Sequence, residues 1–455
     1  MYTLLPLGGA GEIGASCFYL NITGTGIILD CGMHPQKTGL ESLPSFDLIK
    51  NMPVDFVLIS HAHQDHLGAL PFLVKKHPYI KIITTPQTRA IAELTLHDSV
   101  SIIKEQIGED EELEIYSHEE IDLLIKSIEY KAYREEFFVT GYKHESSKPI
   151  KVVFIDAGHI LGSAGILIEF NDYKLFYTGD INLDPQELLT GAELPKTKID
   201  ALILEATYGS TDSSQLRSWK DEADLFAEEA NKIINNGGSI LIPVFALGKT
   251  QEILAAIWKL MEKRKLIQTD IYTGGLGSKL NRVYDYNRYV VNYSKPELEL
   301  RNIPQKNLFD VDNYNEFFKT PSIILASSGM MLEKTTSFQL GKKWLAQSKS
   351  AIFTVGYMEE STPGYRFSKA LKGNKIQITN YSRPSEVKCT IKNFRFGSHS
   401  KREGLLEIVK TLNPSNAILI HGDSTAIDWV GATILKTYKN TKVFKAERRK
   451  KITFG

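Results

Sequence analysis

Three histidines and an aspartate stand close together in the segment LISHAHQDHLGAL, directly after a strongly apolar run. They are His61, His63, Asp65 and His66. Imidazole nitrogens and carboxylate oxygens are the ligands that zinc takes in proteins, and a turn at a strand end lets closely spaced side chains converge on an ion. Because the chain has only 11 histidines, this clustering favours a metal-binding turn over a polar surface turn that is rich in histidine by chance.

Further candidate ligands follow other apolar, strand-like runs. His159 stands in VVFIDAGHILGSAG, Asp180 in LFYTGDINLD and His421 in NAILIHGD. Each taken alone would more often be a polar group that is satisfied by hydrogen bonds. Strand ends on one edge of a sheet meet in space, however, so the sequence predicts that the whole set converges on one site.

The composition bounds the class of protein. With 455 residues the chain is long enough for two or three domains. Its 54 basic and 54 acidic residues give no overall positive field that would attract a polyanion. The cysteines are few, odd in number and scattered, which predicts a reducing compartment, by default the cytoplasm. No apolar run reaches the ~18 residues of a membrane span, and no secretory signal is expected.

The pattern of apolar residues changes along the chain. The first part contains short β-branched runs and reads as a sheet-rich domain. From about Ala201, strands alternate with helices, two of which are predicted at 219–234 and 251–263, and 281–320 reads as loop-rich. Strand, helix and strand in this order predict a parallel, doubly wound sheet.

The end of the chain returns to the first pattern. After Tyr381 a strand is expected in VKCTIKNF, followed by a helix near 402–411 and the strand NAILI. We therefore predict that residues 207–386 form a domain inserted into a host domain made of residues 1–206 and 387–455.

Several motifs then identify a family. HAHQDH, AGHILGSAG and TGD, in this order, resemble the metallo-β-lactamase superfamily. LEATYG, IPVFALGKTQEIL, ASSGMM, FGSHSKREGLLE and IHGD resemble its β-CASP branch, which includes ribonuclease J and the pre-mRNA cleavage and polyadenylation endonuclease. The resemblance covers nearly the whole chain. It implies an α/β fold, a metallo-β-lactamase αββα sandwich with an inserted doubly wound α/β β-CASP domain.

The resemblance also implies two Zn²⁺ ions and their ligands. One ion would be held by His61, His63, His159 and Asp180, and the other by Asp65, His66, Asp180 and His421. Asp180 would bridge the two ions. Asp30 matches a residue that orients the histidine loop without binding metal. Asp65, Glu205 and His399 would be the catalytic residues, with Glu205 and His399 acting as carboxylate and general acid at the leaving group.

The predicted activity follows from this set. Two metals ~3.5–4 Å apart would activate a bridging hydroxide for in-line attack on phosphorus, and His399 would protonate the departing oxygen. The resemblance implies products with a 5′-phosphate and a 3′-hydroxyl. We therefore predict a zinc-dependent ribonuclease, endonucleolytic, exonucleolytic or both, that acts on single-stranded RNA; relatives suggest a homodimer.

Three alternatives stay open. A DNA nuclease of the same branch would differ mainly at the last motif, where His421 fits the RNA-processing subgroup better. A small-molecule hydrolase on the same host fold is disfavoured by the β-CASP-like insertion. A catalytically inactive scaffold subunit is disfavoured because all ligand positions and the Glu205–His399 pair are present.

Two glycine-rich motifs are interpreted as turns. GAGEIG at 9–14 precedes a strand-like run, so a tight hairpin turn fits better than a dinucleotide site. FALGKT has Pro243 where a phosphate-binding loop needs its first glycine, and is predicted to be a strand-to-helix turn.

Contacts with the substrate are predicted at four further positions. They are Lys249, Ser327, Ser328 and Ser398. Ser398 belongs to Gly397-Ser398-His399-Ser400, where relatives commonly have Ser-Ala-His-Ala or Ser-Gly-His-Ala, so local phosphate contacts are expected to differ there.

Overall fold

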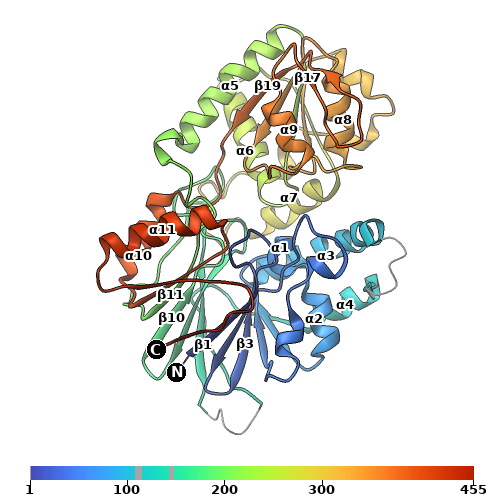
Figure 1. Ribbon diagram of the computed structural model, residues 1–455. Helices are drawn as coiled ribbons and strands as arrows, with labels where there is room; N and C mark the ends of the chain where they lie inside the picture. Colours follow the sequence, from blue (N-terminus) through green and yellow to red (C-terminus); the bar gives the residue numbers. More distant parts are fainter. Residues whose placement is uncertain (1, 108–114, 143–147) are drawn as a thin grey trace. The chain divides into compact units, whose positions relative to one another are not determined.

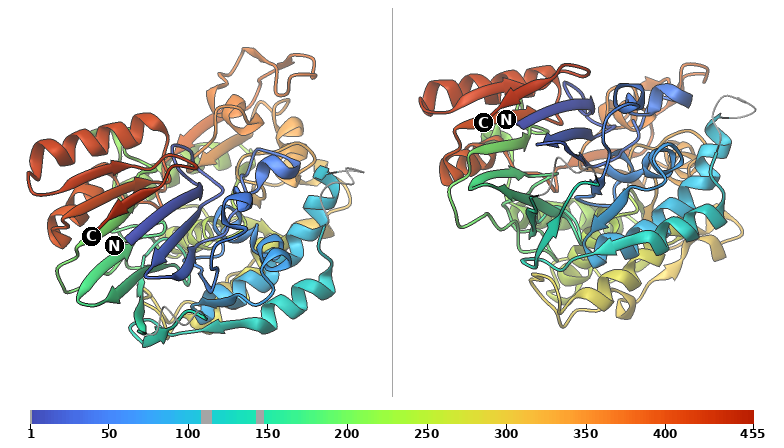
Figure 2. Two further views of the ribbon diagram at one scale, coloured as in Figure 1. Left: turned by 60° about the horizontal axis from the view of Figure 1, so that its bottom comes forward. Right: turned by 90° about the horizontal axis from the view of Figure 1, so that it is seen from below.

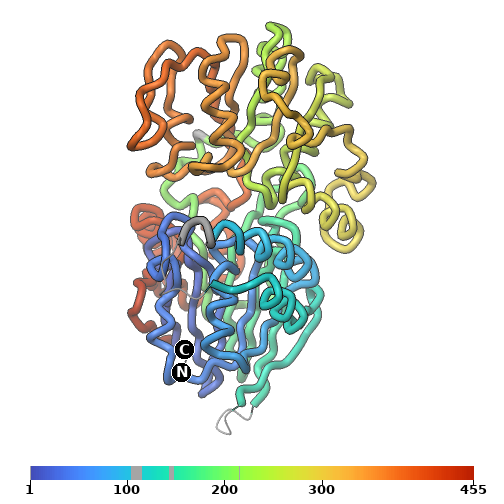
Figure 3. The backbone as a smooth tube through the Cα atoms, turned by 90° about the vertical axis from the view of Figure 1, so that its right-hand side faces the viewer, coloured from blue at the N-terminus to red at the C-terminus, as the bar shows by residue number. Residues whose placement is uncertain are grey.

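The computed structural model describes residues 2–107, 115–142 and 148–455, and the chain divides into two compact units (Figure 1). The first unit comprises Met1–Asp184, Gly191–Ser213 and His399–Gly455, and the second comprises Pro185–Thr190 and Ser214–Ser398. Figure 3 traces the chain from the first unit into the second and back again. Both chain ends lie in the first unit, where the first and last strands pair.

Two seven-stranded sheets form the centre of the first unit. In spatial order one sheet contains β22 (Ile452–Phe454), β1 (Tyr2–Gly8), β2 (Cys17–Ile22), β3 (Thr25–Leu29), β4 (Phe56–Leu58), β5 (Lys81–Thr84) and β6 (Ile128–Tyr130). The other contains β21 (Lys442–Lys445), β20 (Asn416–Ile420), β11 (Ala201–Glu205), β10 (Tyr173–Tyr177), β9 (Ala164–Phe170), β8 (Ile150–Asp156) and β7 (Glu136–Val139). One buried apolar cluster joins the two sheets and includes Phe18, Ile27, Phe154 and Ile166.

Helices cover both outer faces of this pair of sheets. The first sheet is covered by α1 (Gln64–Leu67), α2 (Leu70–Lys76), α3 (Pro86–Ile107) and α4 (His118–Ser127), and the second by α10 (Arg402–Leu412) and α11 (Ser424–Thr437) (Figure 2). Strand β11 shows how the sequence sets this layering. Ile203 faces the cluster between the sheets, whereas Leu202 and Leu204 face the cluster with α10 and α11. A strand buried on both faces needs the continuous apolar run that ALIL supplies.

The second unit contains a parallel six-stranded sheet. Its spatial order is β14 (Lys306–Asn307), β13 (Asp270–Thr273), β15 (Ser322–Ala326), β12 (Ile240–Pro243), β16 (Ala351–Val355) and β19 (Thr390–Phe394). Its helices are α5 (Trp219–Asn235), α6 (Lys249–Glu262), α7 (Gly275–Asn287), α8 (Thr336–Trp344) and α9 (Pro363–Lys369). Together with the αββα layers of the first unit, this sheet confirms the predicted fold class.

The limits of the units differ from the predicted domain limits at two places. Strand β19 lies beyond residue 386 but pairs with β16, so the second unit continues to Ser398. Pro185–Thr190 also belongs to the second unit, because the N–H of Leu188 donates to the Glu252 carboxylate at 2.8 Å. Both connections depend on partners distant in sequence.

Local predictions met mixed outcomes. The strand-to-helix turn in FALGKT is confirmed: β12 ends at Pro243, and α6 begins at Lys249 after Gly248 with φ +79°. The predicted tight turn in GAGEIG is wrong, because residues 9–16 form a longer loop between β1 and β2. Helix α7 occupies the start of the stretch that was predicted to be loop-rich, and α3 and α4 lie in the part of the chain that was predicted to be sheet-rich.

Within the described part of the chain, no helix combines the length and apolar character needed to cross a bilayer.

Candidate metal-dependent active site

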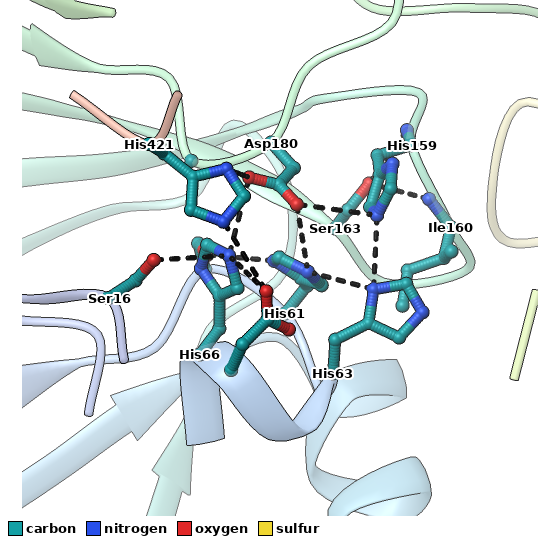
Figure 4. A network of polar contacts seen from close by, with 12 residues as sticks. Ser16, His61, His63, His66, His159, Ile160, Ser163, Asp180 and His421 are labelled. Atoms are coloured by element: carbon teal, nitrogen blue, oxygen red, sulfur yellow. Dashed lines mark hydrogen bonds and ion pairs between the residues drawn. The ribbon is translucent and has the colours of Figure 1, made fainter. Parts of the chain in front are cut away.

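The histidine turn lies at the carboxyl end of β4 and runs into α1 (Figure 4). His61 and His66 are almost completely buried, although each carries a polar ring. Asp65 and His66 occupy the single turn of α1, and His61 and His63 precede it. The turn therefore presents four side chains from a fixed backbone, as its spacing predicted.

The first predicted ligand set converges closely. His63 Nδ1 lies 3.1 Å from Nε2 of His61 and 3.1 Å from Nε2 of His159. Asp180 Oδ2 lies 3.6 Å from the first of these Nε2 atoms and 3.7 Å from the second. These separations of 3.1 to 3.7 Å are compatible with binding of one ion at the ~2.0–2.2 Å that zinc requires, and the four residues form one candidate metal group.

The second predicted set shares the same aspartate. Asp180 Oδ1 lies 3.3 Å from His66 Nε2 and 3.2 Å from His421 Nδ1. Asp65 Oδ2 lies 3.3 Å from His421 Nε2. The two oxygens of Asp180 thus face different groups of ligands, which is the orientation expected of a bridging carboxylate.

The Oδ1 atom of Asp180 makes ion-pair contacts with His66 and His421 but no hydrogen bond with any residue that the structure describes. This atom is buried. A buried carboxylate oxygen without a hydrogen bond is costly unless a cation binds it. The residues present therefore fit a divalent metal.

Electrostatics favour the metal-binding forms of His61 and Asp180. Burial, followed by the charge on His66, lowers the pKa of His61 well below its usual value. Burial opposes ionisation of Asp180, but the imidazoles of His421, His66 and His399 hold the pKa of Asp180 well below its usual range. A neutral imidazole and an ionised carboxylate are the forms that bind metal.

Asp30 supports the histidine turn through hydrogen bonds. Its Oδ2 atom lies 2.8 Å from His66 Nδ1, and its Oδ1 atom accepts the backbone N–H of Ser60 at 2.6 Å. The hydroxyls of Ser60 and Tyr177 also donate to Oδ2. Because Asp30 accepts the Nδ1 proton of His66, the Nε2 lone pair of that ring faces the site.

The structure adds positioning groups that the sequence analysis did not name. Ser60 Oγ lies 3.0 Å from His61 Nδ1, and Ser16 Oγ lies 3.4 Å from His66 Nε2. The N–H of His421 donates to the carbonyl of Gly9 at 2.8 Å. Ser60 could have been found from the sequence, because it directly precedes the histidine turn. Ser16 and Gly9 lie in the loop after β1, and no local pattern connected that loop with the site.

Glu205 and His399 form a hydrogen-bonded pair beside Asp180. Glu205, at the end of β11, accepts the N–H groups of Ile181 and Thr207 at 3.0 Å and lies 3.0 Å from His399 Nδ1. His399 Nε2 lies 4.0 Å from Asp180 Oδ2. Burial opposes protonation, but the carboxylates of Glu205 and Asp180 raise the pKa of His399. The pair can hold a proton on the side that faces the ligands.

Three sequence families match consecutive parts of the chain. They are described as the Metallo-beta-lactamase superfamily at residues 10–228, the Beta-Casp domain at 250–367 and the Zn-dependent metallo-hydrolase RNA specificity domain at 385–444. An RNase J-like protein of Methanocaldococcus jannaschii is 33% identical, and the alignment covers 95% of each chain. The chain belongs to the β-CASP branch of the metallo-β-lactamase superfamily.

Two further comparisons show how much of other proteins this chain covers. Cleavage and polyadenylation specificity factor subunit 3 of Dictyostelium discoideum is 30% identical over 97% of this chain, which spans 56% of that longer relative. A solved structure of a protein of unknown function from Enterococcus faecalis V583 covers both chains fully, with 14% identity and a TM-score of 0.59, and shows the fold alone. The superfamily is metal-dependent, and the ligand clusters described above agree with this.

One departure from the usual β-CASP motif has a structural role. Relatives commonly have alanine after the histidine of this motif, whereas this chain has Ser400. Ser400 Oγ accepts the N–H of Leu183 at 3.0 Å, and its own N–H donates to the Ile181 carbonyl at 2.7 Å. The hydroxyl therefore ties the His399 turn to the loop that follows Asp180.

Lys249, a predicted phosphate contact, is buried in the second unit and has partners there. It is 6% exposed, its ammonium group donates to the Phe396 carbonyl, and it lies 5.7 Å from the centre of the Trp219 ring. Burial lowers the pKa of Lys249 to about 8. In this arrangement the residue supports the fold of the β-CASP domain, and its geometry gives the predicted phosphate contact no support.

The three predicted serine contacts also belong to the second unit. Ser327 and Ser328 follow β15, and their carbonyls accept hydrogen bonds from the N–H and hydroxyl of Ser337. Ser398 directly precedes His399. Their roles as substrate contacts remain predictions.

Proposed function

We propose that this protein is a two-zinc ribonuclease that hydrolyses phosphodiester bonds of single-stranded RNA and leaves 5′-phosphate and 3′-hydroxyl ends. The proposal is carried by Asp180, whose two oxygens face separate ligand sets beside the Glu205–His399 pair. A carboxylate shared by two metal-ligand sets, with a proton donor next to it, suits hydrolysis of a phosphate ester better than redox chemistry or metal storage.

The residues of the site would act either as metal ligands or in proton transfer. One zinc would be held by His61, His63, His159 and Asp180, and the other by Asp65, His66, Asp180 and His421. When bound, the zinc ions would lower the pKa of water and neutralise charge on the phosphoryl group.

His399 would protonate the leaving group. Its Nδ1 atom faces Glu205, so the acidic proton is carried on Nε2, the atom that points toward Asp180. Delivery of that proton to the departing 3′-oxygen yields a 3′-hydroxyl and leaves the phosphate on the 5′ side of the next nucleotide. Glu205 acts through His399: it orients the ring and stabilises the charged form.

RNA as the substrate is supported by the domain matched at residues 385–444, whose description names RNA specificity. The relatives carry names such as RNase J-like protein and cleavage and polyadenylation specificity factor. A homodimer and a cytoplasmic location are part of the proposal; the latter is supported by three cysteines that are all unpaired.

The test is cleavage of labelled RNA by metal-analysed protein. RNA labelled at either end and DNA of the same sequence are incubated with wild type, His399→Ala, Glu205→Gln and the control variant His77→Ala, whose histidine lies at the end of α2. We expect RNA products with 5′-phosphates, a loss of about 10²–10⁴-fold for His399→Ala, and unchanged zinc content.

Equal loss of activity in His77→Ala would show that the assay reports folding. Two results would contradict the proposal. Intact RNA in the presence of two bound zincs would reject a ribonuclease, and cleavage of DNA alone would replace it with a DNA nuclease.

A further inference from the structure

A second cluster of metal-ligating side chains lies on the helices outside the first sheet. His97 belongs to α3, and His118 is the first residue of α4. Their Nδ1 atoms lie 2.8 Å apart, and His97 Nε2 lies 3.1 Å from Asp122 Oδ1, one turn further along α4. The three side chains connect two helices that are neighbours in the first unit (Figure 1).

The arrangement fixes which ring atom of His97 can bind metal. When the carboxylate of Asp122 accepts the Nε2 proton, Nδ1 of His97 accepts a hydrogen bond from Nδ1 of His118, and a bound metal ion would replace that proton between the two rings. A carboxylate behind a histidine is also the usual support of a metal-binding imidazole. The same relation joins Asp30 and His66 in the active site.

The spacing of the nitrogens indicates which ions fit. Two nitrogens 2.8 Å apart, each about 2.0–2.1 Å from one ion, subtend about 85° at that ion. An angle near 90° suits two adjacent positions of a square-planar or tetragonal ion, as formed by Cu²⁺ or Ni²⁺.

We propose that His97 and His118 form a separate binding site for Cu²⁺ or Ni²⁺, in which Asp122 orients His97 from outside the coordination shell. Water completes the coordination, because His97 is 29% exposed and Asp122 is 58% exposed. The active-site ligand Asp180, by contrast, is 3% exposed. The ion at the helix site exchanges readily and links α3 to α4.

The site is independent of the proposed ribonuclease activity. His97 and His118 lie outside every group of active-site ligands, so loss of either ring leaves RNA cleavage unchanged. A failure of the cleavage assay would therefore not bear on copper binding at the helices.

The test adds one equivalent of Cu²⁺ to metal-analysed protein and records the electron paramagnetic resonance spectrum. Wild type is expected to show a tetragonal copper signal with nitrogen hyperfine coupling while its zinc content stays constant. His97→Gln and His118→Gln are expected to bind copper at least tenfold more weakly, Asp122→Asn to bind it more weakly than wild type, and His77→Gln to bind it as wild type does.

Three outcomes would overturn the site. Either an unchanged spectrum and affinity in both His97→Gln and His118→Gln, or the appearance of the signal only as zinc is released, would assign the copper elsewhere. A measurement without substitutions guards against misfolded variants: Cu²⁺ should protect His97 and His118 from carbethoxylation in the unaltered protein. Full modification of both rings at saturating Cu²⁺ would reject the proposal.

Discussion

Each unit of the molecule contains a buried carboxylate with one oxygen that accepts no hydrogen bond from the described residues. In the first unit it is Asp180, and in the second it is Glu252, which is 2% exposed. Imidazoles surround Asp180 and lower its pKa well below the usual range. Around Glu252 burial dominates, and it raises the pKa to about 7 although Leu188 and Lys249 oppose it.

The comparison shows that burial alone does not make a ligand. A buried carboxylate stays ionised only where several positive or polarisable partners face it, and only then can it bind a cation. Glu252 instead accepts the N–H of Leu188, and because its pKa is raised to about 7 it is only partly ionised near neutral pH. The first carboxylate is therefore suited to binding a cation, whereas the second makes a hydrogen bond within the fold.

The largest effect is expected for Asp180→Asn. The amide keeps the shape of the side chain but removes the charge that both ligand sets share. Metal content should fall below two ions per chain. RNA cleavage should fall by more than the roughly 10–100-fold that loss of an outer-shell partner causes. Metal analysis and single-turnover cleavage would measure this, and retention of two ions with full activity would remove Asp180 from the bridging position.

A smaller effect is expected for Glu252→Gln, and it concerns stability. Because the folded-state pKa is about 7 and the usual value is 4.5, the folded protein holds a proton that the unfolded chain has lost in this interval. Wild-type stability contributed by this group is therefore present below pH 4.5 and declines as the pH rises to about 7.

The variant should lack this decline. The difference in unfolding free energy between wild type and Glu252→Gln should change by about 2 kcal/mol between pH 5 and pH 8. Urea unfolding followed by tryptophan fluorescence is suitable, since Trp219, Trp258 and Trp344 of the four tryptophans lie in the second unit. Parallel pH profiles for the two proteins would show that Glu252 titrates normally. Zinc content and RNA cleavage should not change.

The smallest effect is expected for Ser400→Ala, which restores the residue common in relatives. Loss of the hydroxyl leaves the Leu183 N–H without its acceptor and should cost about 1 kcal/mol. If this loss displaces His399 and raises the activation free energy of cleavage by the same amount, the cleavage rate falls about fivefold. Steady-state kinetics beside zinc analysis would separate this from metal loss, and a rate equal to that of wild type would limit Ser400 to a structural role.

Much of the active site was predictable because its residue types are local and unusual. His61, His63, Asp65 and His66 stand in one turn, and the other ligands follow apolar strands. Tyr177 carried no such signal: its hydroxyl reaches Asp30 from the other sheet, and only the packing of two sheets brings them together.

The missed elements have similar causes. Helix α7 begins with glycines at positions 275 and 277, and glycine costs about 1 kcal/mol in a helix interior. Tertiary contacts compensate, since the buried Asp285 carboxylate accepts the N–H groups of Leu300 and Arg301. The prediction placed β19 with the host domain, since parallel pairing with β16, which joins it to the second unit, leaves no mark in the sequence of either strand.

The position of β20 in the second sheet has a consequence for synthesis. This strand lies between β11 and β21, and it delivers His421, which faces Asp65 across 356 residues of chain. Chains emerge from the ribosome N-terminus first. The apolar edge of β11 therefore has no partner strand while residues 214–398 of the second unit are synthesised. Neither the sheet nor the metal centre can be completed before β20 has been made. A ribosome-bound chain would thus be inactive toward RNA until its last strands emerge, and it would need protection from aggregation during that interval.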